Sequence, residues 1–160
     1  MKLHYFRKYS NFGDTINPWF WRHYINCHFD NNSDEIFVGI GTLINDELPV
    51  DCKTLHIMGA GAGYGKKIPR QQKNWIVHCV RGPLTARAIG VSPSHAITDP
   101  AVLLSELVPT MTDRDCTCAF MPHVALDSQR LQKLGLFVIF RGQEPTDDVR
   151  GLTVIEWGLL

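Results

Sequence analysis

The feature that most constrains the fold is a repeated order of short apolar run, turn, and helix start marked by proline. Three of these helix starts place a capping residue directly before the proline: Asn17-Pro18, Gly82-Pro83 and Asp99-Pro100. Proline is favoured at the first helical position, because the N–H that it lacks would have no partner there. Alternating strands and helices predict an α/β fold built on a parallel sheet.

Most of the apolar runs are continuous rather than alternating. Strands buried on both faces show this pattern, which favours a Rossmann-like parallel sheet flanked by helices over a β-sandwich. We expect strands at 3–7, 36–40, 54–58, 75–80, 96–98, 117–121 and 136–140, with a further one at 152–157. We expect helices at 17–25, at 83–89 with a stop at Gly90, at 100–108 and at 127–134.

The length suits one ordinary domain and is too short for two full nucleotide-binding domains. A polar stretch at 109–115 lies between a predicted helix and a predicted strand. Such a stretch is typical of a linker. We therefore expect a Rossmann-like domain over 1–108, with 109–160 forming a linker and the incomplete start of a second α/β domain.

Charge and hydropathy argue against a nucleic-acid-binding protein and against a membrane-spanning one. The 16 basic residues balance the 16 acidic ones, so no bulk field would attract nucleic acid or an acidic membrane surface. No apolar run approaches the roughly 20 residues of a membrane span, and the first residues lack the apolar core of a signal peptide. We expect a cytoplasmic protein with no nucleic-acid partner and no membrane span, and peripheral membrane association stays open.

The cysteine pattern agrees with a reducing compartment. The five cysteines are odd in number, and most lie in or beside apolar runs, where a free thiol packs as a small apolar group. Cys116 and Cys118 are too close in sequence for the usual zinc-ligand pair. We expect no metal.

Arg81 is the strongest candidate for a binding residue. It follows the apolar run 75–80 and precedes the Gly82-Pro83 helix start, so its guanidinium and the first N–H groups of the helix would face an anion. A phosphate or a carboxylate fits that chemistry. The alternative is a surface ion pair beside an ordinary Gly-Pro turn.

Two other predicted strands continue directly into glycine-rich turns, which include Gly41 and Gly61. The second turn imitates a dinucleotide-binding fingerprint, but Tyr64 occupies the place of the third glycine, and a Walker loop is absent. Two interpretations remain. The glycines allow tight turns at the sheet edge, or they line a cleft that a ligand approaches closely.

The turn Asn11-Phe12-Gly13-Asp14 follows the first predicted strand and precedes the first predicted helix. It is expected at the same sheet edge as Arg81. Asn11 would bind a hydroxyl group and Asp14 would accept a proton from one. The alternative is an Asx-turn that caps a helix.

Taken together, these blocks resemble the polysaccharide pyruvyl transferase family, in its bacterial exopolysaccharide branch. The blocks occur in the family's order and with similar separations over roughly 1–123. They are Asn11-Phe12-Gly13-Asp14, Asn17-Pro18-Trp19, Gly39-Ile40-Gly41-Thr42-Leu43, Gly59-Ala60-Gly61, Val80-Arg81-Gly82-Pro83-Leu84-Thr85-Ala86, Thr98-Asp99-Pro100-Ala101 and Met121-Pro122-His123.

The resemblance implies that the chain is the N-terminal domain of a GT-B-like two-domain fold. It implies transfer of the enolpyruvyl group of phosphoenolpyruvate to a nucleotide- or lipid-linked saccharide, with no cofactor besides that donor. The catalytic residues that it implies are Asp14, Arg81 and His123. The substrate-binding residues that it implies are Asn11, Gly13, Asn17, Gly41, Gly61 and Asp99.

The sequence also departs from the family. Members are about twice as long and carry a His-Gly block in the second half, whose histidine is the expected acid. No histidine follows His123 in this sequence. A non-catalytic sugar-binding remnant is therefore the alternative function, and a GT-B-like glycosyltransferase is a weaker one.

Overall fold

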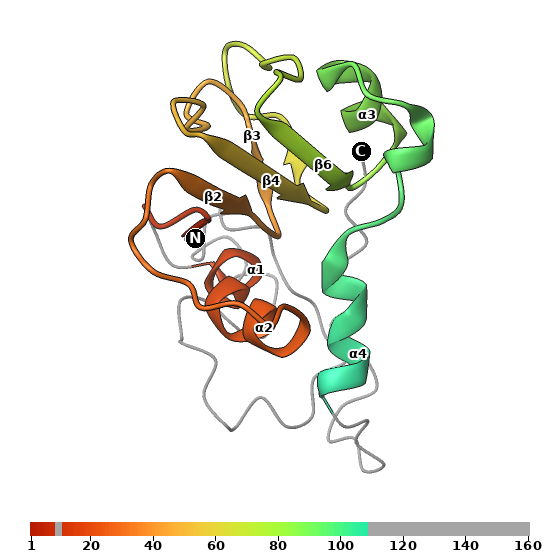
Figure 1. Ribbon diagram of the computed structural model, residues 1–160. Coiled ribbons are helices and arrows are strands. Elements are labelled where there is room, and N and C mark those ends of the chain that lie inside the picture. The colour runs from red at the N-terminus through yellow and green to blue at the C-terminus, as the bar shows by residue number, and fades with distance from the viewer. Residues whose placement is uncertain (9–10, 109–160) are drawn as a thin grey trace, which may run out of the picture.

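The computed structural model describes residues 1–8 and 11–108. Its centre is a sheet of four parallel strands in the order β1-β2-β4-β6 (Figure 1). The strands are β1 (Lys2–His4), β2 (Glu35–Val38), β4 (Thr54–Met58) and β6 (Trp75–Cys79). Helices flank this sheet, so the predicted α/β class is confirmed.

A second, two-stranded parallel sheet was not predicted from the sequence. It pairs β3 (Thr42–Ile44) with β5 (Gly61–Ala62). Each of these strands follows a glycine-rich turn after a strand of the central sheet, β2 or β4. Because both are so short, hydrophobic periodicity gives no signal for either.

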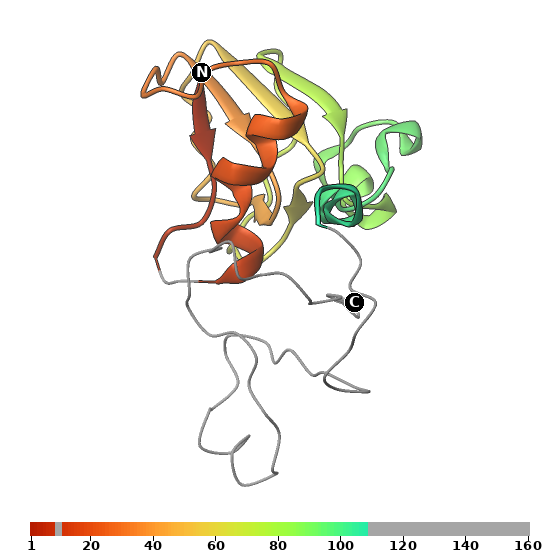
Figure 2. The same ribbon diagram turned by 90° about the horizontal axis from the view of Figure 1, so that it is seen from below.

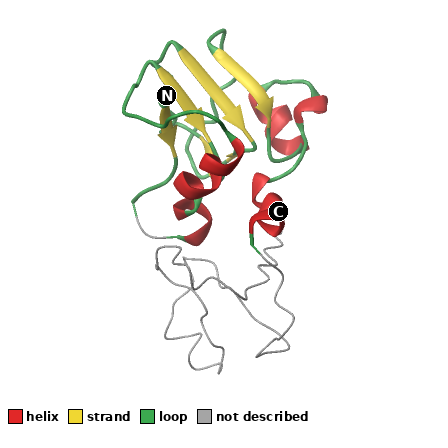
Figure 3. Cartoon of the chain, turned by 60° about the horizontal axis from the view of Figure 1, so that its bottom comes forward, coloured by secondary structure: helices red, strands yellow, loops and turns green. Residues whose placement is uncertain are grey.

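Helices cover both faces of the central sheet (Figures 2 and 3). On one face lie α1 (Phe12–Thr15) and α2 (Asn17–Tyr24), with the 3₁₀ turn η2 (Pro100–Leu103) and α4 (Leu104–Leu107) beside them. The other face packs against α3 (Pro83–Ile89), which is followed by the 3₁₀ turn η1 (Pro93–His95).

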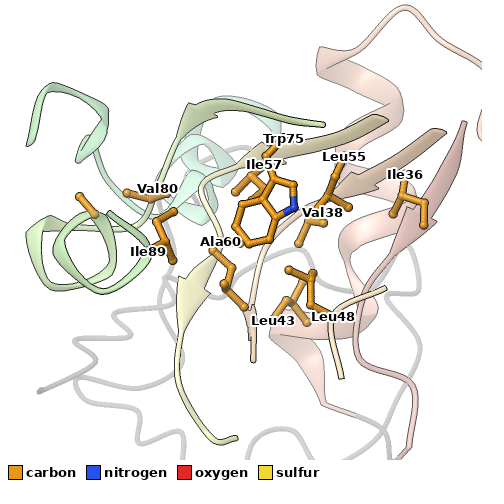
Figure 4. Close-up of a cluster of buried hydrophobic side chains, with 12 residues drawn as sticks. Ile36, Val38, Leu43, Leu48, Leu55, Ile57, Ala60, Trp75, Val80 and Ile89 are labelled. Atoms are coloured by element: carbon orange, nitrogen blue, oxygen red, sulfur yellow. The ribbon is translucent and has the colours of Figure 1, made fainter. Parts of the chain in front are cut away.

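Each face has its own apolar core. Leu55 and Ile57 alternate with the side chains on the other face of β4. They belong to a cluster with Trp75, with Leu43 of β3 and with Ile89 of α3 (Figure 4). On the opposite face, Phe37 packs against Phe20 and Trp21 of α2. These two clusters fix the sheet between its helices.

Burial of β4 and β6 differs from the prediction. The expectation of strands buried on both faces is confirmed for β2, where Ile36, Phe37 and Val38 are all buried. It is wrong for β4 and β6, whose burial alternates along each strand. In β6, Ile76 is 47% exposed and His78 is also exposed. The α2 side of the sheet is thus half open over these strands.

The ends of α3 match the prediction. Gly82 is its N-cap and Pro83 its first residue, and Gly90 ends it in the left-handed conformation, with φ of 81°. The predicted cap of α2 is wrong, because Ile16 holds the N-cap position and Asn17 already lies inside the helix. The buried Asn17 side chain instead bonds to a neighbouring loop, as described below.

Other boundaries need correction. The first two strands end earlier than predicted, at His4 and Val38. The predicted strand 96–98 is wrong, since only a single bridge joins Val80 to Ala96. The predicted helix 100–108 begins as a 3₁₀ turn. The predicted elements at 117–121, 127–134, 136–140 and 152–157 lie outside the described residues, and the division into two domains stays a prediction.

Within residues 1–8 and 11–108, no helix has the length and apolar character needed to cross a membrane.

His4 makes stability sensitive to acid. Burial, reinforced by the positive charges of Lys2 and Arg7, lowers the pKa of His4 from 6.5 to about 4. The folded state therefore favours neutral His4, and its contribution to stability is complete above pH 6.5 and lost as the pH falls toward 4. Because of His4, we expect the free energy of unfolding to fall by about 3 kcal/mol over that pH range. Urea unfolding at pH 7 and pH 4.5 should show a smaller pH dependence for His4→Gln, and an unchanged dependence for the exposed control His28→Gln.

Candidate anion-binding site

The parallel strands bring several of the predicted site residues to one edge of the sheet. The carboxyl ends of β1, β2, β4 and β6 share that edge, and ligands of open α/β sheets bind there. The segments that follow these strands carry Asp14, Gly41, Gly61 and Arg81 in turn.

Arg81 is held by contacts from three other segments. Its Nη1 donates a hydrogen bond to Oγ1 of Thr42, at 2.9 Å, and its backbone N–H bonds to the carbonyl of Ala60. Its Nε lies 3.0 Å from Oδ2 of Asp99. That N–H is buried and has no well-aligned acceptor among the described residues, so the attraction to Asp99 is chiefly electrostatic.

The guanidinium of Arg81 rests on the backbone of Gly61. A Cβ at Gly61 would lie 2.9 Å from Cζ of Arg81 and 3.0 Å from its Nη1. A side chain at this position would have to displace the flexible end of Arg81, because the guanidinium occupies the space where that side chain would begin. Of the two interpretations of the glycine-rich turn, close approach applies at this position, but the approaching group belongs to the protein.

Asp99 serves both as a cap and as the partner of Arg81. Its Oδ1 accepts a hydrogen bond from the N–H of Ala101 at the start of η2, while Oδ2 faces Arg81. The side chains of Asp99 and Arg81 are 36% and 37% exposed, so the pair contributes about 0–1 kcal/mol to stability. In this structure Asp99 orients Arg81.

Asp14 lies beside Gly41, the residue that directly precedes Thr42. Its Oδ1 is 2.8 Å from the position of a Cβ at Gly41, and φ of Gly41 is +132°, a conformation that side chains disfavour. The N–H of Gly61 bonds to the carbonyl of Gly41, at 2.9 Å. Asp14 and Arg81 therefore flank the segment Gly41-Thr42.

Asn11 and Gly13 form the Asx-turn that the sequence left as an alternative. Oδ1 of Asn11 accepts from the N–H of Gly13, at 3.0 Å, and caps α1. A Cβ at Gly13 would meet only ordinary van der Waals contact. This turn places Asp14 in the first turn of α1.

Asn17 lies behind this edge and is fully buried. Its Nδ2 donates to the carbonyls of Asp14 and Ile40, and its Oδ1 accepts from the N–H of Ile40 and from Nε1 of Trp21, all within 3.0 Å. The amide thus ties α2 to the turn after β2. These contacts are structural, and the substrate contact that the resemblance implies for Asn17 stays a prediction.

The remaining predictions have different outcomes. His123 lies outside the described residues. Sequence reasoning missed two threonines: Thr42, which binds Arg81, and the buried Thr85, whose Oγ1 accepts from the N–H of Ala62. Both lie within blocks that carry the family resemblance, and that was the only available signal.

The arrangement suits an anion better than a metal or a thiol reaction. In the described part of the chain, no group of three or more His, Cys, Asp or Glu side chains is placed to hold a metal ion. Burial raises the pKa of the Cys79 thiol, which opposes a nucleophilic thiolate. An arginine has five N–H donors, and the contacts to Thr42 and Asp99 leave Nη2 of Arg81 without a partner among the described residues.

Gly61→Ala is a test of this geometry that should spare the fold. The new Cβ would push on the flexible end of Arg81, so we expect anion affinity to fall about tenfold while the free energy of unfolding changes by less than about 1 kcal/mol. Titration calorimetry and urea unfolding measure the two effects. The matched control is Gly82→Ala, since a Cβ there meets nothing within 4 Å. Equal anion affinity in both variants would contradict the contact.

Comparison with known proteins gives one informative similarity. The chain is 36% identical over 110 residues to the succinoglycan biosynthesis protein ExoV of Rhizobium meliloti (strain 1021). The match covers 67% of this chain and 34% of that protein, so the chain matches about a third of the relative's length. No family model matches the chain, and no solved structure matches it.

Proposed function

We propose that this chain contributes the phosphoenolpyruvate-binding wall of a polysaccharide pyruvyl transferase that acts in exopolysaccharide biosynthesis. The observation that carries the proposal is the placement of Arg81 at the carboxyl edge of the sheet, held over Gly61 by Thr42 and Asp99. The similarity to a succinoglycan biosynthesis protein supports the same class of pathway. The proposal places the chain in the cytoplasm, as its sequence predicts.

The reaction requires an anion clamp. Phosphoenolpyruvate carries a carboxylate and a phosphate. Transfer of its enolpyruvyl group to two saccharide hydroxyls forms a ketal and releases inorganic phosphate. A guanidinium binds either anion through paired, charge-assisted hydrogen bonds. Among the described residues, Nη2 of Arg81 has no hydrogen-bond partner, and the contacts to Thr42 and Asp99 restrain the guanidinium before phosphoenolpyruvate binds. Orientation in advance reduces the entropic cost of reaching the transition state.

The reaction also moves protons. Two hydroxyl protons leave the saccharide as its oxygens bond to C2 of phosphoenolpyruvate. One proton adds to the methylene carbon, which becomes a methyl group, and the other is taken up by the released phosphate. Asp14 lies at the same edge and is proposed to accept a proton from an attacking hydroxyl. His123 is proposed as the second acid–base group, on the sequence resemblance alone.

The direct test is incubation of the chain with phosphoenolpyruvate and a panel of nucleotide- and lipid-linked saccharides. We expect stoichiometric release of phosphate and formation of an acid-labile ketal. Saccharide binding without either product, measured by calorimetry, would replace this proposal with the non-catalytic sugar-binding function.

A further inference from the structure

Three side chains form a hydrogen-bonded row across the half-open face of the central sheet. Oε1 of Glu35 lies 3.2 Å from Nε2 of His56, and Nδ1 of His56 lies 3.1 Å from Nε2 of His78. The two imidazole rings are nearly parallel, with an interplanar angle of 9° and centroids 5.4 Å apart. The residues come from β2, β4 and β6, and none of them takes part in the contacts around Arg81.

The strand register places these side chains together. His56 pairs with Ile76, so His78 lies diagonally across from it on the same face of the sheet. Glu35 lies diagonally across from His56 on the other neighbouring strand, because it pairs with Thr54. His78 is exposed and the His56 side chain is 17% exposed, so the row is open to ions from solvent.

The hydrogen bonds constrain which nitrogens carry protons. A neutral histidine has one donor and one acceptor nitrogen. When Nε2 of His56 donates to the Glu35 carboxylate, its Nδ1 is left as an acceptor directed at His78. Two imidazoles whose facing nitrogens lie 3.1 Å apart resemble a metal-chelating pair.

We propose that His56 and His78 chelate a transition-metal dication of the zinc, nickel or copper type through Nδ1 and Nε2, respectively. Metal–imidazole bonds are about 2.0–2.1 Å long, which puts neighbouring ligand nitrogens about 3.0–3.4 Å apart, and the observed separation is 3.1 Å. Imidazole is a preferred ligand of these ions. Glu35 would hold His56 in the required tautomer, as carboxylates behind metal-bound histidines do.

Binding needs only small changes in the protein. The proton on Nε2 of His78 moves to its Nδ1, so that both facing nitrogens present lone pairs, and no net proton is released. The exposed ring of His78 turns to direct its lone pair at the ion. Two ligands from the chain leave the other coordination positions to water, which is consistent with the absence of a three-residue ligand set in the described part of the chain.

The test is calorimetric titration of the full chain with Zn²⁺ and, separately, Ni²⁺ at pH 7.5, comparing wild type with His56→Gln and His78→Gln. We expect each variant to bind one ion fewer than wild type. Ions bound elsewhere in the chain do not affect this difference, because wild type and variants share those sites. Glu35→Gln should keep the stoichiometry and weaken binding about 10-fold or more. His28→Gln, which changes an exposed histidine outside the row, is the matched control and should titrate like wild type.

A spectroscopic readout separates binding from folding. Zn²⁺ should shift the ring-proton NMR signals of both His56 and His78, and thermal unfolding without metal should be unchanged in His78→Gln, because that side chain is exposed. Wild-type stoichiometry in either histidine variant, or a shift confined to one ring, would overturn the two-nitrogen site. Should His56→Gln fail to fold, His78→Gln and the ring signals still decide the question.

Discussion

Replacing Asn17 with alanine is expected to lower the free energy of unfolding by about 3–5 kcal/mol. The Asn17 amide is fully buried and serves both the N–H and the carbonyl of Ile40, together with Nε1 of Trp21 and the carbonyl of Asp14. Alanine would leave these groups buried without their partner, at a cost of about 1–3 kcal/mol for each unsatisfied group before relaxation. Urea unfolding monitored by tryptophan fluorescence measures the loss.

Two graded controls accompany this prediction. Trp21→Phe removes one of the hydrogen bonds and should cost about 1–2 kcal/mol. Asn11→Ala removes the half-buried cap of α1 and should cost about 1 kcal/mol. A loss in Asn17→Ala no larger than that in Asn11→Ala would show that this amide does not anchor α2 to the sheet edge.

Replacing Arg81 with methionine is expected to weaken phosphoenolpyruvate binding about 100-fold or more. Methionine keeps much of the apolar stem but removes every donor of the guanidinium, which is the group that the proposed clamp depends on. Arg81→Lys should also bind phosphoenolpyruvate weakly. A single ammonium group cannot contact Thr42 and Asp99 and bind the ligand at the same time. Calorimetric titration with phosphoenolpyruvate gives the affinities.

The matched control for this substitution is Arg87→Met. Arg87 is exposed in the last turn of α3, six residues beyond Arg81, and the change removes the same charge. Phosphoenolpyruvate affinity should remain within about twofold of wild type in this variant. An equal loss in both variants would mean that the anion responds to total charge rather than to the position of Arg81.

Local signals explain the part of the fold that could be predicted. The start and end of α3 follow from Gly82-Pro83 and Gly90, which restrict the backbone within a few residues. The strand at 54–58 was predicted with its observed boundaries, because its apolar run is bounded by polar residues and glycine. Parallel pairing followed from strands alternating with helices.

The part that could not be predicted depends on contacts between distant segments. The bond between Arg81 and Thr42 spans 39 residues, and the bond between Asn17 and Ile40 spans 23. Nothing in the sequence around Asn17 distinguishes an amide that binds a substrate from one that is buried under a helix. The row from Glu35 to His78 depends on strand register in the same way, and register is set by the whole sheet.

The most direct test of the central claim, an anion site centred on Arg81, is NMR spectroscopy of its Nε–H during titration with phosphoenolpyruvate. We predict a saturable shift of this signal, together with shifts of the backbone amides of Thr42 and Gly61, the residues that contact the guanidinium. The amide shifts should vanish in Arg81→Met and persist in Arg87→Met. An Arg81 signal that stays unchanged at saturating phosphoenolpyruvate, or amide shifts that persist in Arg81→Met, would contradict the account.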